Sequence, residues 1–590
     1  MENISKEYVT YEEFGAKGDG VTDDIEAIKA AHDYANEHNV NVRTNPHATY
    51  YIGPRPITVT IKTAVDWSTT KFIIDDSKVT LEDRGARVFA VRSNYEPIDF
   101  SIPSLKKNQM RLEGVSFPRN CYVRVENAEK KQFIRYGNNQ TNGSNQVDSF
   151  IVDKTGYILN PVIWNFEKVT KAIACPIDET VLTISGGIFT TIANQAESKL
   201  NYHTRGILIT RSNVIVEKIT HKIVGELDHG APYGGFITIW GCAYVTLRDS
   251  FLTGRKIYWA QGSAGNPVPA GSYGLSITHA VNIHVENLRQ NGIMDNTRWG
   301  IMCTDHCRDL YFDNCIMSRF DAHENVVNLT IRNTILGHQC FNAIGHGNMV
   351  VDNVTAYGNS FLNLRFDYGN SWDGDVIFRN CTWYPAANNA SPSFIGVNNY
   401  VKNEMGFGGH DFGFPCYMPH RITIENLHIC DSCGPENYRG AQIFNVSANA
   451  MNSDKRLDFN DNSVLFPYFF AECLYMKNVT CDSGKGIRLF SNETKYCYAL
   501  KRNKTADGKP RPNFRAVIED TMLSGESIIP ETVLGPEDFD GTYHVVPRIE
   551  LHNCTNVVFD AVKTPAVLKI VDCEVVKCEE NGIASVSISN

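Results

Sequence analysis

The sequence lacks any hydrophobic run that approaches the ~18 apolar residues of a membrane-spanning helix. It also lacks an excess of positive charge, because 66 Asp and Glu residues outnumber 56 Lys and Arg residues and the formal net charge is −10. A basic surface is the electrostatic footprint of most nucleic-acid-binding proteins. We therefore expect neither a membrane nor a nucleic acid to be the main partner.

A secretory signal is also missing from the first residues. The opening "MENISKEYVTYEEFG" has no basic region followed by an apolar stretch. A cytoplasmic location is therefore expected, although a secreted protein whose signal had been removed would have the same sequence.

Cysteine, by contrast, is abundant, with 17 residues spread along the chain. Many end strand-like units such as "DNC", "RNC" and "HNC", which include Cys315, Cys381 and Cys554. Buried free thiols are expected at these positions, and they suit a reducing compartment. Cys430 and Cys433 have metal-ligand spacing, but no second pair lies nearby, so no metal site is predicted.

An internal repeat dominates the 590 residues. The pattern apolar-x-apolar-x-Asn/Asp recurs in units such as "LYFDNC", "LTIRNT" and "MVVDNV", and each unit is typical of a short strand ended by a turn. Asn314, Asn333 and Asn353 follow one another at 19 and 20 residues, whereas other copies lie further apart. Successive repeats that share a shortest spacing, but are often longer by a variable number of residues, predict one solenoid coil per repeat, with the extra residues inserted on one side. The Asn or Asp is expected to hydrogen-bond the backbone of the next coil.

The predicted fold is all-β, a right-handed parallel β-helix with an N-terminal capping helix and an inserted β subdomain. The capping helix is predicted after a strand and a Gly-rich turn, with Asp23 as N-cap and Glu26 in the reciprocal position. Ile25, Ile28 and Ala31 form its apolar stripe, which suits closure of the open end of the coils.

Three domains are predicted along the chain. Residues 1–95 hold the cap and the first coils, 96–182 an inserted antiparallel β subdomain, and 183–590 the main β-helix with a catalytic cleft. The insertion is predicted because this stretch alternates and turns without the Asn repeat. It could form a wall or a contact in a homo-oligomer, either a dimer or a trimer.

Two copies of Arg-Phe-Asp are the most unusual feature, in "SRFDAHE" (318–324) and "NLRFDYG" (363–369). Alternation along a strand would place Arg319, Asp321 and His323 on one face. The two Phe residues are 46 positions apart, which corresponds to two coils of about 23 residues. A single such pair is usually a surface ion pair of small energy. Two copies together favour a functional site.

Counting along the coils predicts the register of this site. Ala343 should lie between Arg319 and Arg365, and Gly345 between Asp321 and Asp367, with Ile344 opposite the two Phe side chains. Two rungs place the two carboxylates on the order of 10 Å apart on one exposed face. Inverting glycosidases hold their carboxyls ~6.5–9.5 Å apart to admit a water.

Several polar side chains are expected on the same few coils. His346 could bind substrate or only satisfy backbone, and Asp375 could bind substrate or only cap a turn. A second cleft element, "DHGAPYGG", carries His229 and Tyr233. The candidate catalytic residues are Asp321, Asp367, His323 and His338, and the candidate substrate-binding residues are Arg319, Arg365, Asn363, His346, Trp372 and Asp375.

The segment "FGAKGDGVTDD" resembles the opening signature of the pectate-lyase and polygalacturonase-related β-helix superfamily, which includes glycosyl hydrolases. The resemblance covers residues 11–39 and extends to the repeat pattern from about 183 to 590. The order "NTR" (296–298), "RFDAH" and "GHG" (345–347) is also similar to polygalacturonases, but Arg298 replaces an Asp. The resemblance implies a carbohydrate-active β-helix.

Three functions remain open at this point. Asp321 and Asp367 could be the acid and base of an inverting glycoside hydrolase acting on a uronate-containing poly- or oligosaccharide. Alternatively, Arg319 or Arg365 could neutralise a uronate carboxylate while His323 or His338 removes the C5 proton, as in a polysaccharide lyase. The third hypothesis is a tailspike-like glycan-binding or depolymerase protein. No cofactor is expected, apart from a calcium ion if the protein is a lyase.

Overall fold

The computed structural model describes residues 7–397, 412–446, 468–469, 471–490, 514–528, 548–560, 567–579 and 585–589. By compactness the chain divides into two units. Unit 1 comprises Met1–Lys130 and Asn145–Arg319, and unit 2 comprises Lys131–Ser144 and Phe320–Asn590. The three domains predicted from the sequence were defined by sequence pattern rather than by compactness, so they stay a prediction. Part of the third domain, 183–590, lies outside the described residues.

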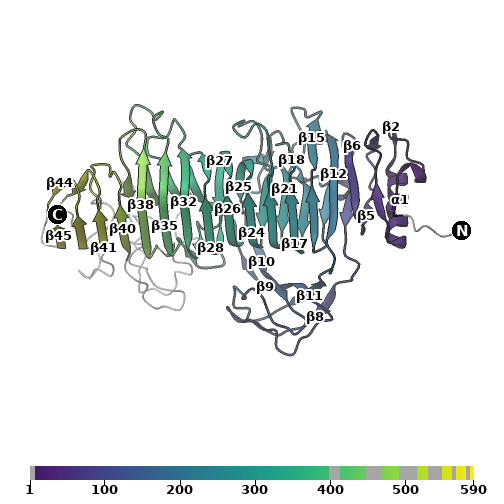
Figure 1. The fold of residues 1–590 in the computed structure, drawn as a ribbon, viewed down its shortest axis with the longest axis horizontal. Helices are drawn as coiled ribbons and strands as arrows, with labels where there is room; N and C mark the ends of the chain where they lie inside the picture. Colours follow the sequence, from purple (N-terminus) through teal and green to yellow (C-terminus); the bar gives the residue numbers. More distant parts are fainter. Residues whose placement is uncertain are drawn as a thin grey trace. The chain divides into compact units, whose positions relative to one another are not determined.

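Unit 1 begins with a cap and continues as parallel coils (Figure 1). Helix α1 (Ile25–His38) buries the apolar stripe expected from the sequence, including Ile28 and Ala31. Within the described residues, no helix is long and apolar enough to cross a membrane. Neighbouring parallel strands are β6 (Val65–Asp75), β12 (Leu182–Ile192), β14 (Val214–Glu217), β17 (Ala243–Arg248), β22 (Val281–Glu286) and β24 (Cys307–Asp313).

The helix begins one residue later than predicted. Asp24 is the N-cap of α1, and its carboxylate accepts hydrogen bonds from the backbone amides of Lys17 at 2.7 Å and Gly18 at 3.1 Å. Glu26 instead bonds Arg55 at 3.1 Å. The predicted N-cap, Asp23, instead accepts the Ile25 amide at 3.2 Å and Arg55 at 2.8 Å, so the predicted reciprocal capping box of Asp23 and Glu26 is wrong.

Unit 2 repeats the same coil on two runs of parallel strands. The first run contains β26 (Val326–Arg332), β28 (Gly345–Asp352), β32 (Val376–Tyr384), β35 (Arg421–Ile429), β38 (Cys473–Cys481), β40 (Arg515–Glu519), β41 (Arg548–His552), β43 (Val567–Val571) and β45 (Ser585–Ser589). The second contains β27 (Ile335–Ala343), β30 (Ser360–Leu364), β33 (Ser393–Val397), β36 (Gln442–Val446) and β39 (Arg488–Phe490). The predicted right-handed parallel β-helix is thus confirmed (Figure 1).

The repeated Asn residues form a ladder of side-chain amides. Asn333, Asn353, Asn380, Asn426 and Asn478 all have left-handed backbone conformation, with φ between 49° and 56°. Asn is one of the few non-glycine residues that adopts this conformation readily. The donor Nδ2 of Asn353 lies 2.8 Å from Oδ1 of Asn333, and that of Asn426 lies 3.0 Å from Oδ1 of Asn380. These side chains bond the neighbouring side chain rather than the neighbouring backbone, which corrects the prediction.

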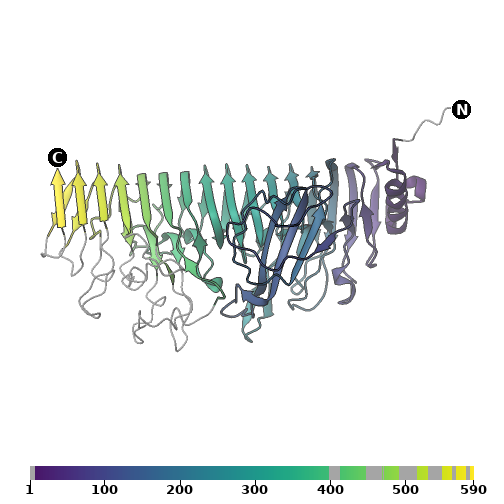
Figure 2. The ribbon, with the colours of Figure 1, turned by 90° about the horizontal axis from the view of Figure 1, so that it is seen from below.

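An antiparallel sheet interrupts the coils of unit 1. Its strands are β8 (Ile98–Phe100), β9 (Cys121–Gln132), β10 (Ser144–Val152) and β11 (Lys171–Pro176), in the order β10-β9-β11-β8. Phe150 and Phe166 belong to its own apolar core. Figures 1 and 2 show the sheet on one flank of the coils, where Arg308 of β24 pairs with Asp148 at 2.8 Å.

The 16 cysteines of the described part are free thiols. Cys315, Cys381 and Cys554 are buried, as predicted. Burial raises the pKa of the Cys381 thiol to about 12, so it remains protonated at neutral pH. Cys497 lies outside the described residues.

Candidate active site

Arg365 links the two Asp residues of the Arg-Phe-Asp sequences. Its Nε lies 2.9 Å from Oδ1 of Asp367 and one terminal nitrogen lies 2.7 Å from Oδ2, a bidentate pair. Its other terminal nitrogen lies 2.7 Å from Oδ1 of Asp321. Asp367 is not on a strand, because β30 ends at Leu364 and the chain continues into the 3₁₀ turn η3 (Phe366–Tyr368).

Both carboxylates are buried, which corrects the prediction of an exposed pair. The exposed fraction is 0% for Asp321 and 6% for Asp367. The Arg365 guanidinium contacts both of them, where the sequence predicted room for a water between them. A charged carboxylate tolerates such burial only when cations and hydrogen bonds compensate it, which Arg365 provides here.

The predicted register is also wrong. Ala343 pairs with Leu364, one residue before Arg365. Phe320 packs against Phe341, with ring centroids 5.4 Å apart, rather than opposite Ile344. Strand β27 ends at Ala343, so Gly345 belongs to the next strand, β28, and pairs there with Trp372. A corner of the coil separates the two stretches that the prediction places on one strand.

Arg365, Asp321 and Asp367 form a cluster of charged side chains, and His323 joins this cluster through a contact with Asp321. Nε2 of His323 lies 3.0 Å from Oδ2 of Asp321, the carboxylate oxygen opposite the one that binds Arg365. The His323 side chain is 19% exposed whereas Asp321 is fully buried. The arrangement is therefore an imidazole open to one side and backed by a buried carboxylate. A carboxylate in this position fixes the orientation of the ring and its tautomer.

Arg135 completes the cluster and was not found from the sequence. Its Nε lies 2.8 Å from Oδ2 of Asp367, and its side chain is 24% exposed. It lies on the connection 133–143 between β9 and β10, which is held by a bond from the Tyr136 amide to the Asp367 carbonyl at 2.9 Å. Ser144, the first residue of β10, donates its hydroxyl to Glu324, the residue that follows His323. No local pattern marks Arg135, because its partner is 232 positions away.

The charge state of Asp367 follows from these contacts. Burial alone would raise its pKa, but the charges of Arg365 and Arg135 outweigh this effect and lower the pKa to about 2. Asp367 is therefore ionised at neutral pH. An ionised carboxylate cannot donate a proton to a leaving group, so Asp367 is poorly suited to be a general acid.

This pKa predicts a pH dependence of stability. Because the folded pKa lies below the usual value of 3.8, Asp367 contributes stability that is complete above pH 3.8 and is lost as the pH falls toward 2. Two pKa units correspond to on the order of 2 kcal/mol for this buried group. We expect the difference in unfolding free energy between the wild type and Asp367→Asn to shrink by this amount across that window, measured by urea unfolding. A difference that stays constant with pH would contradict the prediction.

Trp372 and His346 are buried near the cluster's coils. Trp372 has an exposed fraction of 0%, and its indole nitrogen donates to the Gly347 carbonyl at 2.9 Å. It therefore offers no ring face to a sugar, contrary to the prediction. His346 is 7% exposed, and its Nδ1 lies 2.9 Å from Oδ1 of Asn325. This contact favours a structural role for His346.

The other predicted residues are dispersed. Asn363 donates to Oδ1 of Asn342 at 2.8 Å in a side-chain stack of its own. His338 lies on β27 and Asp375 just before β32, and both are partly buried. Arg319 is the last residue of unit 1. Within that unit its guanidinium lies 4.8 Å from the centroid of a Trp299 ring.

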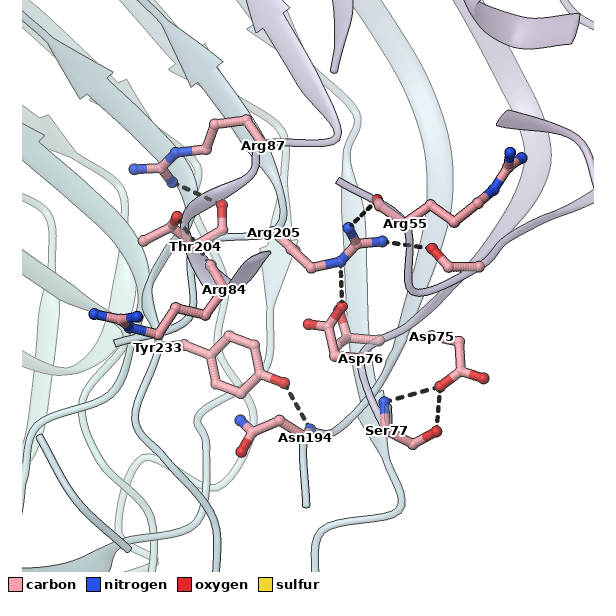
Figure 3. Close-up of polar contacts among 12 residues, drawn as sticks. Arg55, Asp75, Asp76, Ser77, Arg84, Arg87, Asn194, Thr204, Arg205 and Tyr233 are labelled. Carbon is pink, nitrogen blue, oxygen red and sulfur yellow. Dashed lines mark hydrogen bonds and ion pairs between the residues drawn. The ribbon is translucent and has the colours of Figure 1, made fainter. Parts of the chain in front are cut away.

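Of the second cleft element considered from the sequence, His229 is exposed, whereas Tyr233 lies in a buried ion cluster of unit 1 (Figure 3). Arg205 has a fully buried side chain whose Nε lies 2.7 Å from Oδ1 of Asp76. Its terminal nitrogens donate to the carbonyls of Arg55 and Gly53, both at 2.7 Å. The hydroxyl of Tyr233, nearby in Figure 3, accepts the Asn194 amide at 2.8 Å and is 3% exposed. This cluster supports the fold and offers no open surface.

Comparison with known proteins gives similarity of fold only. No family model matches the sequence, and no curated protein matches it. Among solved structures, the tailspike gp49 of Pseudomonas phage LKA1 is 12% identical, with 99% of this chain and 83% of that chain covered and a TM-score of 0.46. The Gp54 tailspike of Acinetobacter baumannii bacteriophage AP22, solved in complex with a capsular saccharide, is 10% identical over 98% and 77%, with a TM-score of 0.44. The A-module of the Azotobacter vinelandii mannuronan C-5 epimerase AlgE4 is 10% identical over 98% and 100%, with a TM-score of 0.25.

Proposed function

We propose that the protein acts on a uronate-containing polysaccharide by β-elimination, with His323 as the base. The observation that carries this proposal is the contact between Nε2 of His323 and Oδ2 of the buried Asp321, at 3.0 Å. A partly exposed imidazole held by a buried carboxylate is the arrangement that a positioned proton acceptor requires.

The proton transfer uses both nitrogens of the ring. Because Nε2 contacts Asp321, the other ring nitrogen, Nδ1, is the proposed acceptor of the substrate proton. In β-elimination the base removes the proton from C5 of the uronate, and the electron pair forms the C4–C5 double bond. The C4–O bond then breaks, and the leaving oxygen takes up a proton from water. His323 supplies the first of these steps.

Arg135 is the proposed cation for the uronate carboxylate. Its Nε is bonded to Asp367, and its side chain is partly exposed, so its terminal nitrogens can reach a ligand. Neutralising the carboxylate makes the adjacent C5 proton more acidic, and the fork of guanidinium donors matches a carboxylate. Arg365 is less suited to this role, because three of its N–H groups already bind Asp321 and Asp367.

The same geometry is unfavourable for inverting hydrolysis. That mechanism requires a protonated carboxyl and a second carboxylate that activates a water between them. Asp367 has a pKa of about 2, and Arg365 contacts both carboxylates. Elimination requires neither a protonated Asp367 nor a water between the two groups.

The reaction can be tested on a panel of neutral and uronic-acid glycans. Both new reducing ends and the ultraviolet absorbance of a 4,5-unsaturated product would be followed. We expect both signals with uronate glycans and neither with neutral glycans. Reducing ends without absorbance would indicate hydrolysis instead, and binding without either signal would indicate a glycan-binding protein.

A further inference from the structure

A cluster with three different metal-binding side chains lies on unit 2, outside the proposed active site. His428 is near the end of β35, Cys430 follows two positions later, and Asp482 comes directly after β38. Strands β35 and β38 are parallel neighbours, with His428 opposite Thr480. One ligand atom from each of the three side chains lies within 4.8 Å of the others.

The ligand atoms are close to the separation that one ion requires. Nε2 of His428 lies 3.2 Å from Oδ1 of Asp482. In a tetrahedral zinc site, bonds of ~2.0–2.3 Å place the ligand atoms ~3.3–3.7 Å apart. Binding would therefore need only small side-chain adjustments. His428 and Asp482 are 46% and 40% exposed, so an ion can enter from solvent.

Thr480 orients the imidazole. Nδ1 of His428 lies 3.0 Å from Oγ1 of Thr480, and this contact leaves Nε2 directed toward Asp482. Histidine ligands of metals are commonly held in this way, through a hydrogen bond to the ring nitrogen that does not bind the metal. Thr480 is thus a positioning residue for the cluster.

We propose that His428, Cys430 and Asp482 form a zinc-binding site, with water as the fourth ligand. The combination of nitrogen, sulfur and oxygen donors suits zinc, whereas calcium and magnesium prefer sites made of oxygen atoms alone. The site differs from the Cys430 and Cys433 spacing noted in the sequence. Cys433 is exposed and does not belong to the cluster.

The test uses the full chain after removal of metal with a chelator. Zinc affinity would be measured by competition with a chromogenic chelator, and cobalt would serve as a spectroscopic substitute. We expect one tightly bound zinc per chain and, with cobalt, a thiolate-to-metal charge-transfer band. His428→Asn, Cys430→Ser and Asp482→Asn should each weaken zinc binding at least ~10-fold, and Thr480→Val should weaken it ~10–100-fold.

Two control variants distinguish this site from zinc binding elsewhere on the chain. Cys433→Ser removes the other cysteine of the "CDSC" sequence, and His420→Asn disrupts a second His-Asp contact, with Asp373 at 3.0 Å, that has no cysteine in its cluster. Both should bind zinc like the wild type. Zinc should raise the Tm of the wild type and of both controls but not that of Cys430→Ser. Unchanged affinity in Cys430→Ser, loss of binding in Cys433→Ser, or no stoichiometric zinc in the wild type would each overturn the proposal.

Discussion

Replacing His323 by Gln is expected to reduce the rate of product formation from a uronate glycan at least ~100-fold, since a positioned proton acceptor contributes ~10²–10⁴. Gln can keep a hydrogen bond to Asp321, at 3.0 Å from the present ring nitrogen, but cannot accept the C5 proton. The initial rate would be followed by the absorbance of the unsaturated product. The loss should lie in kcat, with KM changed little.

His420 provides a matched control for this prediction. Its Nε2 also lies 3.0 Å from an Asp oxygen, that of Asp373, and its side chain is 29% exposed. His420→Gln should therefore keep a near-wild-type rate. If His323→Gln retained the wild-type rate while Asp321→Asn and Asp367→Asn were inactive, the carboxylates would carry the reaction and hydrolysis would replace elimination.

Replacing Arg205 by Met is expected to lower the free energy of unfolding by ~3–5 kcal/mol, because it leaves the buried Asp76 without its ion-pair partner. Burial already raises the pKa of Asp76 to about 6, against the lowering effect of Arg205. In the variant this pKa should rise further, so the loss of stability should be smaller at pH 5 than at pH 8. Urea unfolding at both pH values measures the two differences.

Arg248 gives the comparison for an ion pair in the same unit whose cation is exposed to solvent, although its partner Glu217 is mostly buried. Its guanidinium bonds Glu217 through two nitrogens at 2.8 Å and 2.6 Å, but its side chain is 42% exposed. Arg248→Met should cost ~1 kcal/mol or less. Equal losses in the Arg205 and Arg248 variants would show that burial does not determine the energy of the Asp76 pair.

The coils could be predicted from the sequence because their determinants are local and repeated. Each strand carries its own alternation, and the corner that follows it commonly has an Asn or Asp with a left-handed backbone, such as Asn353, although Lys218 takes this position after β14. The two Arg-Phe-Asp sequences were predicted to contribute to one site, and they do lie together, but Arg365 joins Asp321 to Asp367 where a water between the carboxylates was predicted.

The parts that could not be predicted depend on distant contacts or on where a strand ends. The register failed because β27 ends at Ala343, and no residue type between Ala343 and Gly345 signals that corner. Arg135 was missed because it reaches Asp367 from an inserted connector. The burial of Trp372 was missed because the sequence does not show whether this tryptophan faces the core or solvent, where it could stack on a sugar.

The side-chain ladder has a direction along the chain. In the side-chain bonds between corners of the described part of the chain, the later residue donates and the earlier one accepts, as in the bonds from Asn478 to Asn426 and from Asn426 to Asn380. An Asp carboxylate can only accept, so it can occupy the first position of a hydrogen-bonded run but no later one. Asp520, which accepts from Asn553, stands at such a first position. An Asp at a corner therefore starts a new run of hydrogen-bonded side chains, and a run can also end between two Asn corners, because Asn380 donates to Asp352 rather than to Asn353.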